Sequence, residues 1–184
     1  MADLILAIVG LPGSGKSEVI NYLIKRYKWP KVYFGDVTFD EMKIRGLEIN
    51  EKNERFVRED LRKSFGQLHY AKKVIEKINN LKEEPNILVE SLYSWDEYLE
   101  FKKEYGDIFK VLAVYSSPDT RIKRLENRSV RPLTREEVNS RDYSQIENLR
   151  QAGPIARADF TVINEGKLEE MHDQIDNIIS KHFK

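Results

Sequence analysis

Eight residues near the N-terminus have the composition and spacing of a phosphate-binding loop. They follow the pattern G-x-x-x-x-G-K-S and are Gly10, Leu11, Pro12, Gly13, Ser14, Gly15, Lys16 and Ser17. The glycines let the backbone turn tightly and direct its N–H groups at an anion. The lysine ammonium can reach the β- and γ-phosphates of a nucleotide, and the serine hydroxyl can ligate Mg²⁺. The loop therefore predicts nucleotide binding, and the absence of an N/T-K-x-D sequence that selects guanine favours ATP with Mg²⁺ as the cofactors.

The elements on either side of the loop are those that the chemistry requires. Residues 4–9 form an apolar run with the length and β-branched content of a buried strand, and residues 16–27 can form a helix. A helix that starts at this point directs its positive N-terminus toward the phosphates. The alternative is a glycine-rich turn that only joins a strand to a helix, but such a turn does not require Lys16 and Ser17 directly after the last glycine.

Short apolar runs alternate with longer amphipathic segments along the whole chain, as in a parallel sheet covered by helices. The expected strands are residues 4–9, 31–34, 87–90, 109–115 and 160–163. The expected helices are residues 16–27, 37–46, 53–65, 67–81, 95–105, 118–128, 135–151 and 168–180. This pattern predicts a single α/β domain over residues 1–184, a doubly wound P-loop NTPase fold with its ligand at the carboxyl ends of the strands.

Two segments interrupt the alternation. Between the second and third strands the chain spends roughly fifty residues, more than one crossover helix needs, which predicts a helical insertion at about residues 37–82 for a second substrate. Residues 128–140 are polar and basic, which predicts a mobile lid.

Composition narrows the class of protein. The chain has 31 basic and 31 acidic residues, so no global positive field recruits nucleic acid or a membrane surface. It has no cysteine, and its three histidines are scattered without the spacing of metal ligands. We find no signal peptide and no apolar segment of membrane-spanning length, and we expect a soluble cytoplasmic protein.

Four segments together resemble an archaeal P-loop family that is related to adenylate kinases and dephospho-coenzyme A kinases. They are the phosphate loop, Phe-Gly-Asp-Val at 34–37, Ser-Pro-Asp-Thr-Arg at 117–121, and Ala-Asp-Phe-Thr-Val-Ile-Asn-Glu-Gly at 158–166. The resemblance runs over essentially the whole chain. It implies a nucleoside monophosphate kinase-like fold: a five-stranded parallel sheet flanked by helices, a helical acceptor-binding region and a lid.

The resemblance also gives roles to charged residues outside the loop. Asp36 matches the Asp that follows the second strand in adenylate kinases, where it could orient an acceptor or a magnesium-bound water; an N-cap for the next helix is an equal alternative. Arg141 and Arg150 resemble later arginines that neutralise the transferred phosphoryl group in this superfamily.

Arg124 and Arg128 resemble the Arg-x-x-x-Arg sequence that opens an adenylate kinase lid, where it contacts nucleotide and phosphates. Arginine suits this task because its planar guanidinium pairs bidentately with phosphate and keeps its charge. The alternative is a solvated helix face, since Arg121 and Lys123 show how charged this helix is.

The acceptor side departs from the related kinases. Glu90 ends the third strand, where P-loop proteins usually carry an acidic residue that holds Mg²⁺, although an ordinary strand-end carboxylate is the alternative. The segment Glu-Ser-Leu-Tyr at 90–93 replaces Asp-Gly followed by Arg, and Phe39 stands where adenylate kinases have an acceptor-binding Arg. Basic residues of the insertion that could substitute are Lys43, Arg45, Arg55, Arg58 and Arg62.

These features predict a phosphotransferase that moves the γ-phosphoryl group of Mg-ATP to a small nucleotide-like acceptor, with AMP as the first expectation. The altered acceptor segment favours a second hypothesis, a nucleotide-binding switch or regulatory ATPase that acts on a protein partner. A third is a kinase for a larger acceptor, such as dephospho-coenzyme A or a polynucleotide 5′-hydroxyl. The neutral net charge argues against the polynucleotide.

Overall fold

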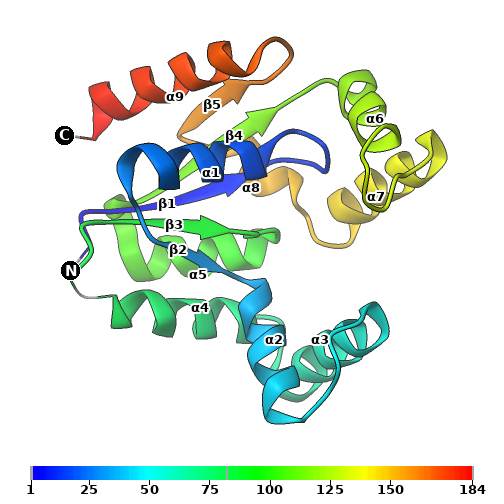
Figure 1. Cartoon of the computed structure of the whole chain (residues 1–184). Coiled ribbons are helices and arrows are strands. Elements are labelled where there is room, and N and C mark those ends of the chain that lie inside the picture. Colours follow the sequence, from blue (N-terminus) through cyan, green and yellow to red (C-terminus); the bar gives the residue numbers. More distant parts are fainter. Residues whose placement is uncertain (1, 82, 184) are drawn as a thin grey trace.

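A parallel β-sheet lies at the centre of the structure (Figure 1). The computed structural model describes residues 2–81 and 83–183, and within them five strands pair in the order β2-β3-β1-β4-β5. They are β1 (Leu4–Val9), β2 (Lys31–Tyr33), β3 (Asn86–Glu90), β4 (Phe109–Tyr115) and β5 (Phe160–Ile163). All residues of β1 are buried, because this strand has a neighbour on each edge and helices over each face. The predicted five-stranded parallel sheet is confirmed.

Helices cover both faces of the sheet, and alternate residues of β1 point to the two layers. Leu6 and Ile8 pack on one side, whereas Ile5 and Ala7 pack on the other. The first layer is α1 (Lys16–Tyr27) with α9 (Leu168–His182); the second contains α4 (His69–Asn80), α5 (Trp95–Tyr105) and α8 (Ala152–Ala156). Within the described residues, no helix is long and apolar enough to cross a membrane.

Three helices fill the long connection between β2 and β3. They are α2 (Gly35–Ile44), α3 (Glu51–Phe65) and α4, and the first two extend beyond the sheet (Figure 1). The side chain of Asn50 caps α3 by accepting a hydrogen bond from the backbone N–H of Asn53 at 2.9 Å. The connection is therefore helical where the sequence predicts a helical insertion.

Two helices follow β4 on the side of the sheet that holds the carboxyl ends of the strands. They are α6 (Pro118–Glu126) and α7 (Arg135–Glu147), joined by the basic loop 127–134. Val138 of α7 is fully buried against Ile122 and Leu125 of α6. A hydrophobic contact thus holds these two helices together.

Several predicted helix boundaries are wrong. The helix expected at 53–65 begins at Glu51, the one expected at 67–81 is His69–Asn80, and the one expected at 37–46 ends at Ile44. The helix expected at 135–151 is broken into α7 and α8, because Arg150 adopts a left-handed conformation with a φ of 53°. The helix expected at 118–128 ends at Glu126, where the side chain of Asn127 donates to the carbonyl oxygen of Lys123 at 2.7 Å. The helix expected at 37–46 begins two residues earlier, at Gly35.

Candidate functional site

The phosphate loop connects β1 to α1 at the carboxyl edge of the sheet, and its glycines are required by space as well as by conformation. Gly10 and Gly15 have φ values of 147° and 99°. A Cβ at Gly10 would lie 2.5 Å from the carbonyl oxygen of Val114, and one at Gly15 would lie 2.2 Å from Asn164 Nδ2. No side chain caps the N-terminus of α1, so its first N–H groups can bind an anion.

Lys16 begins α1 and turns back over the loop. Its Nζ donates to the carbonyl oxygen of Leu11 at 3.0 Å. Burial, and next the charge of Arg121, lower the pKa of Lys16 from 10.5 to about 8, although the Glu90 and Asp142 carboxylates act in the opposite direction. Phosphate oxygens would stabilise the protonated form of this amine. Ser17 follows with its side chain exposed, as a magnesium ligand must be.

A buried network fixes the loop from behind. The carbonyl oxygen of Ser14 accepts a hydrogen bond from Asn164 Nδ2 at 2.8 Å, and Asn164 is held by Ser116, whose Oγ donates to its carbonyl oxygen at 2.6 Å. The guanidinium of Arg124 donates to Ser116 Oγ at 2.9 Å and to the Asn164 carbonyl oxygen at 2.9 Å. Arg124 therefore lies behind the loop, where it supports the backbone that would hold phosphates.

The second arginine of the predicted lid pair is placed differently. Arg128 lies beyond the end of α6, so the expectation that it shares a helix face with Arg124 is wrong. Its Nε donates to the carbonyl oxygen of Arg131 within the loop 127–134. Arg121, whose charge in the sequence supports the alternative of a solvated helix face for Arg124 and Arg128, is only 3% exposed.

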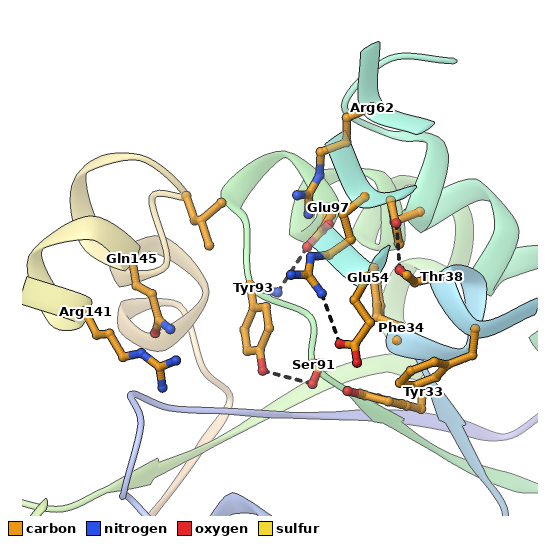
Figure 2. A pocket seen from close by; sticks show the side chains of 15 residues that line it. Tyr33, Phe34, Thr38, Glu54, Arg62, Ser91, Tyr93, Glu97, Arg141 and Gln145 are labelled. Carbon is orange, nitrogen blue, oxygen red and sulfur yellow. Dashed lines mark hydrogen bonds and ion pairs between the residues drawn. The ribbon is translucent and has the colours of Figure 1, made fainter. Parts of the chain in front are cut away.

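A cavity of about 480 Å³ lies at the carboxyl ends of β2 and β3, between α3 and α7. Figure 2 shows Glu54 and Arg62 of α3 on one side of it, Arg141 and Gln145 of α7 on the other, and Tyr93 between them. Its lining also includes the aromatic side chains of Tyr33, Phe34, Phe39 and Tyr70. The cavity thus combines cationic walls with flat apolar surfaces.

Three arginines reach this cavity, and two of them come from the helical insertion. Arg58 Nη1 lies 3.5 Å from Glu54 Oε2, and the guanidinium of Arg62 lies 5.1 Å from the ring centroid of Tyr70. Arg141 is exposed on α7. Of the candidate replacements, Arg58 and Arg62 line the cavity, whereas Arg45 is bound to Glu41 and Asp60 on the outer surface.

The segment 90–93, whose sequence differs from that of the related kinases, contributes Ser91 and Tyr93 to the cavity lining. Ser91 has a φ of 70°, a left-handed conformation that a glycine at this position would adopt without strain. Its Oγ donates to the Tyr93 hydroxyl at 3.0 Å. Glu97 accepts hydrogen bonds from the backbone N–H groups of Tyr93 and Ser94 at 3.0 and 2.9 Å, and burial raises its pKa. These contacts hold Tyr93 in place beside the cavity.

Asp36 and Glu90 lie near Tyr33, but neither is among the residues that line the cavity. Burial raises the pKa of Tyr33, and the nearby groups Tyr93, Glu90 and Asp36 add to the effect. Asp36 is in the first turn of α2 and Phe34 is the N-cap, so the predicted N-cap alternative for Asp36 is wrong. Glu90 Oε2 lies 2.6 Å from Lys31 Nζ.

The residues present fit Mg²⁺ only as a partly hydrated ion. No group of three or more His, Asp or Glu side chains among residues 2–81 and 83–183 could hold a metal ion. Mg²⁺ commonly takes one or two protein ligands and completes its shell with water and substrate phosphates. Ser17 and Glu90 could supply such contacts, directly or through water.

Several residues that support the site are not among the site residues predicted from the sequence. Arg121 and Asp142 form a buried ion pair, with Nη2–Oδ2 at 2.6 Å. Gln151 is fully buried, and its Nε2 donates to the Gly10 carbonyl oxygen at 3.2 Å. Ser116 and Asn164 each directly follow a strand at the ligand edge of the sheet, and Asn164 also lies in the segment 158–166 that carries the family resemblance.

Comparisons with known proteins agree with this geometry. Residues 9–150 match the family model described as an AAA domain. The chain is 33% identical over 186 residues to a UPF0200 protein of Thermococcus kodakarensis, covering 97% of this chain and 100% of the relative. It is 35% identical over 185 residues to a UPF0200 protein of Methanocaldococcus jannaschii, covering 97% and 90%.

Solved structures show the same fold at lower identity. TT1252 from Thermus thermophilus superposes with a TM-score of 0.70 at 20% identity over 100% of both chains. A shikimate kinase from Aquifex aeolicus gives a TM-score of 0.57 at 20% identity over 96% of both chains. A second shikimate kinase, from Bacteroides thetaiotaomicron, gives 0.60 at 11% identity over 97% of both.

Proposed function

Because the chain belongs to the UPF0200 family of P-loop proteins, we propose that it is a phosphotransferase that moves the γ-phosphoryl group of Mg-ATP to a small nucleotide-like acceptor. AMP is the first acceptor to test. The observation that carries this proposal is the cavity of about 480 Å³ at the carboxyl ends of β2 and β3, on the same edge of the sheet as the phosphate loop, with arginines on two walls. A nucleotide switch needs the phosphate loop but no second cavity lined by arginines.

The donor half of the proposed site is the phosphate loop with Lys16 and Ser17. The loop N–H groups and the Lys16 ammonium would stabilise negative charge on the β- and γ-phosphates. Ser17 and Glu90 would orient Mg²⁺, which when bound neutralises charge on the phosphate oxygens. The buried contacts of Ser14 with Asn164, and of Gly10 with Gln151, keep this loop preorganised.

The acceptor half is the cavity between α3 and α7. Arg58, Arg62 and Arg141 offer charge-assisted hydrogen bonds to an anionic acceptor. The rings of Tyr33 and Phe39, 6.5 Å apart, supply a surface against which a base could pack. This combination of cationic and aromatic groups supports a nucleotide-like acceptor.

In the transfer step, an acceptor oxygen forms a bond to the γ-phosphorus while the bond from that phosphorus to the β,γ-bridging oxygen breaks, leaving ADP. Asp36 would orient the acceptor, and Arg128 and Arg141 would stabilise charge on the transferred group from the lid side. Arg124 contributes by holding the loop from behind.

The first experiment is calorimetric titration with AMP, with and without a non-hydrolysable ATP analogue and Mg²⁺. Any acceptor that binds is then tested for phosphoryl transfer, with dephospho-coenzyme A as a larger candidate. Two separate sites, with ADP formed from AMP and ATP, are the expected result. A single ATP site with slow hydrolysis that no small acceptor stimulates would overturn the proposal in favour of a switch.

Lys16→Ala is the matching control variant. It should abolish transfer and weaken ATP binding, while circular dichroism and the melting temperature show that the domain stays folded. Wild-type turnover by this variant would refute the assignment of the phosphate loop to catalysis.

A further inference from the structure

Arg121 is a buried cation that the proposed transfer step does not use. Its guanidinium forms a bidentate pair with Asp142, with Nη1–Oδ1 at 3.0 Å and Nη2–Oδ2 at 2.6 Å. It also donates to the carbonyl oxygen of Pro12 at 3.1 Å and to that of Ser116 at 3.2 Å. One side chain therefore joins the phosphate loop, the end of β4 and α7.

Asp142 is next to Arg141 in the sequence, and three residues before Gln145. Adjacent residues of a helix point about 100° apart, so an α7 that directs Asp142 at α6 can direct Arg141 into the cavity. Figure 2 shows Arg141 and Gln145 on this wall. The ion pair of Asp142 with Arg121 fixes how α7 is rotated about its axis and how far it is displaced along that axis. It therefore also fixes the position of Arg141.

Stability alone does not account for this pair. The side chains of Arg121 and Asp142 are 3% and 13% exposed, and burying two charges costs desolvation that an apolar pair of similar volume would avoid. The apolar contact of Val138 with Ile122 and Leu125 already joins α7 to α6. What an ion pair adds is a fixed geometry, because both bonds of the guanidinium fork require one orientation.

The same pair also acts on the phosphate-binding lysine. The positive charge of Arg121 lowers the pKa of Lys16, and the negative charge of Asp142 raises it. A change in the position of either partner therefore changes the electrostatic environment of Lys16, and phosphate binding at Lys16 acts back on the pair.

We propose that Arg121 and Asp142 are positioning residues that couple the conformation of the phosphate loop to the position of Arg141 at the acceptor cavity. A triphosphate bound to the preorganised loop would restrain the Pro12 carbonyl further; through the contacts of Pro12 with Arg121 and of Arg121 with Asp142, α7 is then restrained with Arg141 directed at the acceptor. The role of Arg141 rests on the proposed function; the mechanical link from the loop to α7 does not.

Hydrogen exchange of α7 tests the link without any acceptor. Exchange at residues 135–147 is measured with and without a non-hydrolysable ATP analogue and Mg²⁺, in the wild type, in Asp142→Asn and in Asp119→Asn. Asp119 is the matched control because it also joins α6 to α7, through an exposed pair with Arg135 at 3.1 Å. The analogue should slow exchange in the wild type and in Asp119→Asn, and this slowing should be lost in Asp142→Asn although the analogue still binds.

A kinetic readout separates positioning from mere stability. In Asp142→Asn the KM for the acceptor should rise about fivefold or more, the lower end of typical coupling between sites, and should rise by a larger factor than the KM for ATP. An equal rise in the KM for the acceptor and the KM for ATP, together with a lowered melting temperature, would overturn the proposal. So would exchange of α7 in Asp142→Asn that responds to the analogue as it does in the wild type. An enzyme with no acceptor would refute the proposed function, and the exchange experiment would still decide the coupling.

A second variant covers failure of Asp142→Asn to fold. Asp142→Glu retains the carboxylate, so the exchange response of α7 to the analogue should persist. The added methylene should displace α7 and raise the KM for the acceptor. An unchanged acceptor KM in this variant would overturn the positioning role.

Discussion

Lys16 Nζ lies 3.0 Å from the carbonyl oxygen of Leu11, so the ammonium closes a hydrogen bond across the phosphate loop itself. The carbonyl occupies one of the three donor directions of the amine. With Arg121 nearby and little water around it, the amine has a pKa of about 8, well below its ordinary 10.5. The protonated form that phosphate requires is therefore lost not far above neutral pH.

ATP affinity should depend on pH through this group. Phosphate stabilises the ammonium and raises its pKa in the complex, so binding takes up a proton whenever the free protein has lost it. Affinity should be full below pH 8 and should fall above it, by up to about tenfold per pH unit. Titration calorimetry from about pH 7 to about pH 9.5 measures this, with Lys16→Arg as the control, because a guanidinium does not titrate there. A flat affinity profile for the wild type would contradict the expectation.

The cavity-lining arginines of α3, Arg58 and Arg62, should contribute to acceptor binding and not to ATP binding. Removing Arg62 takes away one or more charge-assisted hydrogen bonds, each worth about 1.5–3 kcal/mol. We expect Arg62→Ala to raise the acceptor KM roughly 10- to 100-fold while the KM for ATP stays within about twofold. Steady-state kinetics with each substrate varied in turn measures both constants, and Arg58→Ala should behave in the same way.

Arg55→Ala is the matched control for these variants, since Arg55 is on the same helix but pairs with Glu59 at the surface, outside the cavity lining. An equal effect in Arg55→Ala would mean that the net charge of α3, and not the cavity, attracts the acceptor.

Arg124 and Arg128 should give opposite phenotypes despite their shared sequence signature. Arg124→Ala removes the donor to the Ser116 hydroxyl and one of the two donors to the Asn164 carbonyl oxygen behind the loop. The melting temperature and ATP affinity should therefore fall together, with about 2–4 kcal/mol lost from the free energy of unfolding. Arg128→Ala removes an arginine of the loop 127–134 and, if this loop closes over the phosphates as proposed, should lower kcat with the melting temperature unchanged. Calorimetry and steady-state kinetics on both variants separate the two roles. A stable Arg124→Ala protein with wild-type ATP affinity would show that the network does not support the loop.

The sequence predicts those parts of the site whose conformation depends on residues that are neighbours in the chain. The phosphate loop requires glycines at positive φ, and the sheet requires runs of apolar residues. Each requirement produces a pattern of a few consecutive residues that can be recognised in the sequence. Arg121 shows the limit. On a helix with Lys123 and Glu126 it is typical of a solvated face, but contacts with Pro12, Ser116 and Asp142, all distant in the sequence or on other elements, bury it. The break at Arg150 had no glycine or proline to mark it. Likewise, Arg58 and Arg62 could be named as candidates, but choosing them required the placement of α3 beside the cavity.

Glu90 should control the requirement for Mg²⁺. Glu90 is the last residue of β3, and its carboxylate is close enough to Lys16 to raise the pKa of that lysine. A Mg²⁺ ion bound to the phosphates beside Lys16 would carry water ligands, and the Glu90 carboxylate could accept a hydrogen bond from one of them. Glu90→Gln keeps the shape and removes the charge, and should raise the Mg²⁺ concentration for half-maximal transfer about tenfold. Lys31→Met is the control, because it removes the partner of Glu90 at 2.6 Å and leaves the carboxylate in place, so its Mg²⁺ requirement should not rise. An unchanged Mg²⁺ dependence in Glu90→Gln would instead identify Glu90 as a strand-end carboxylate whose function is the ion pair that joins β3 to β2.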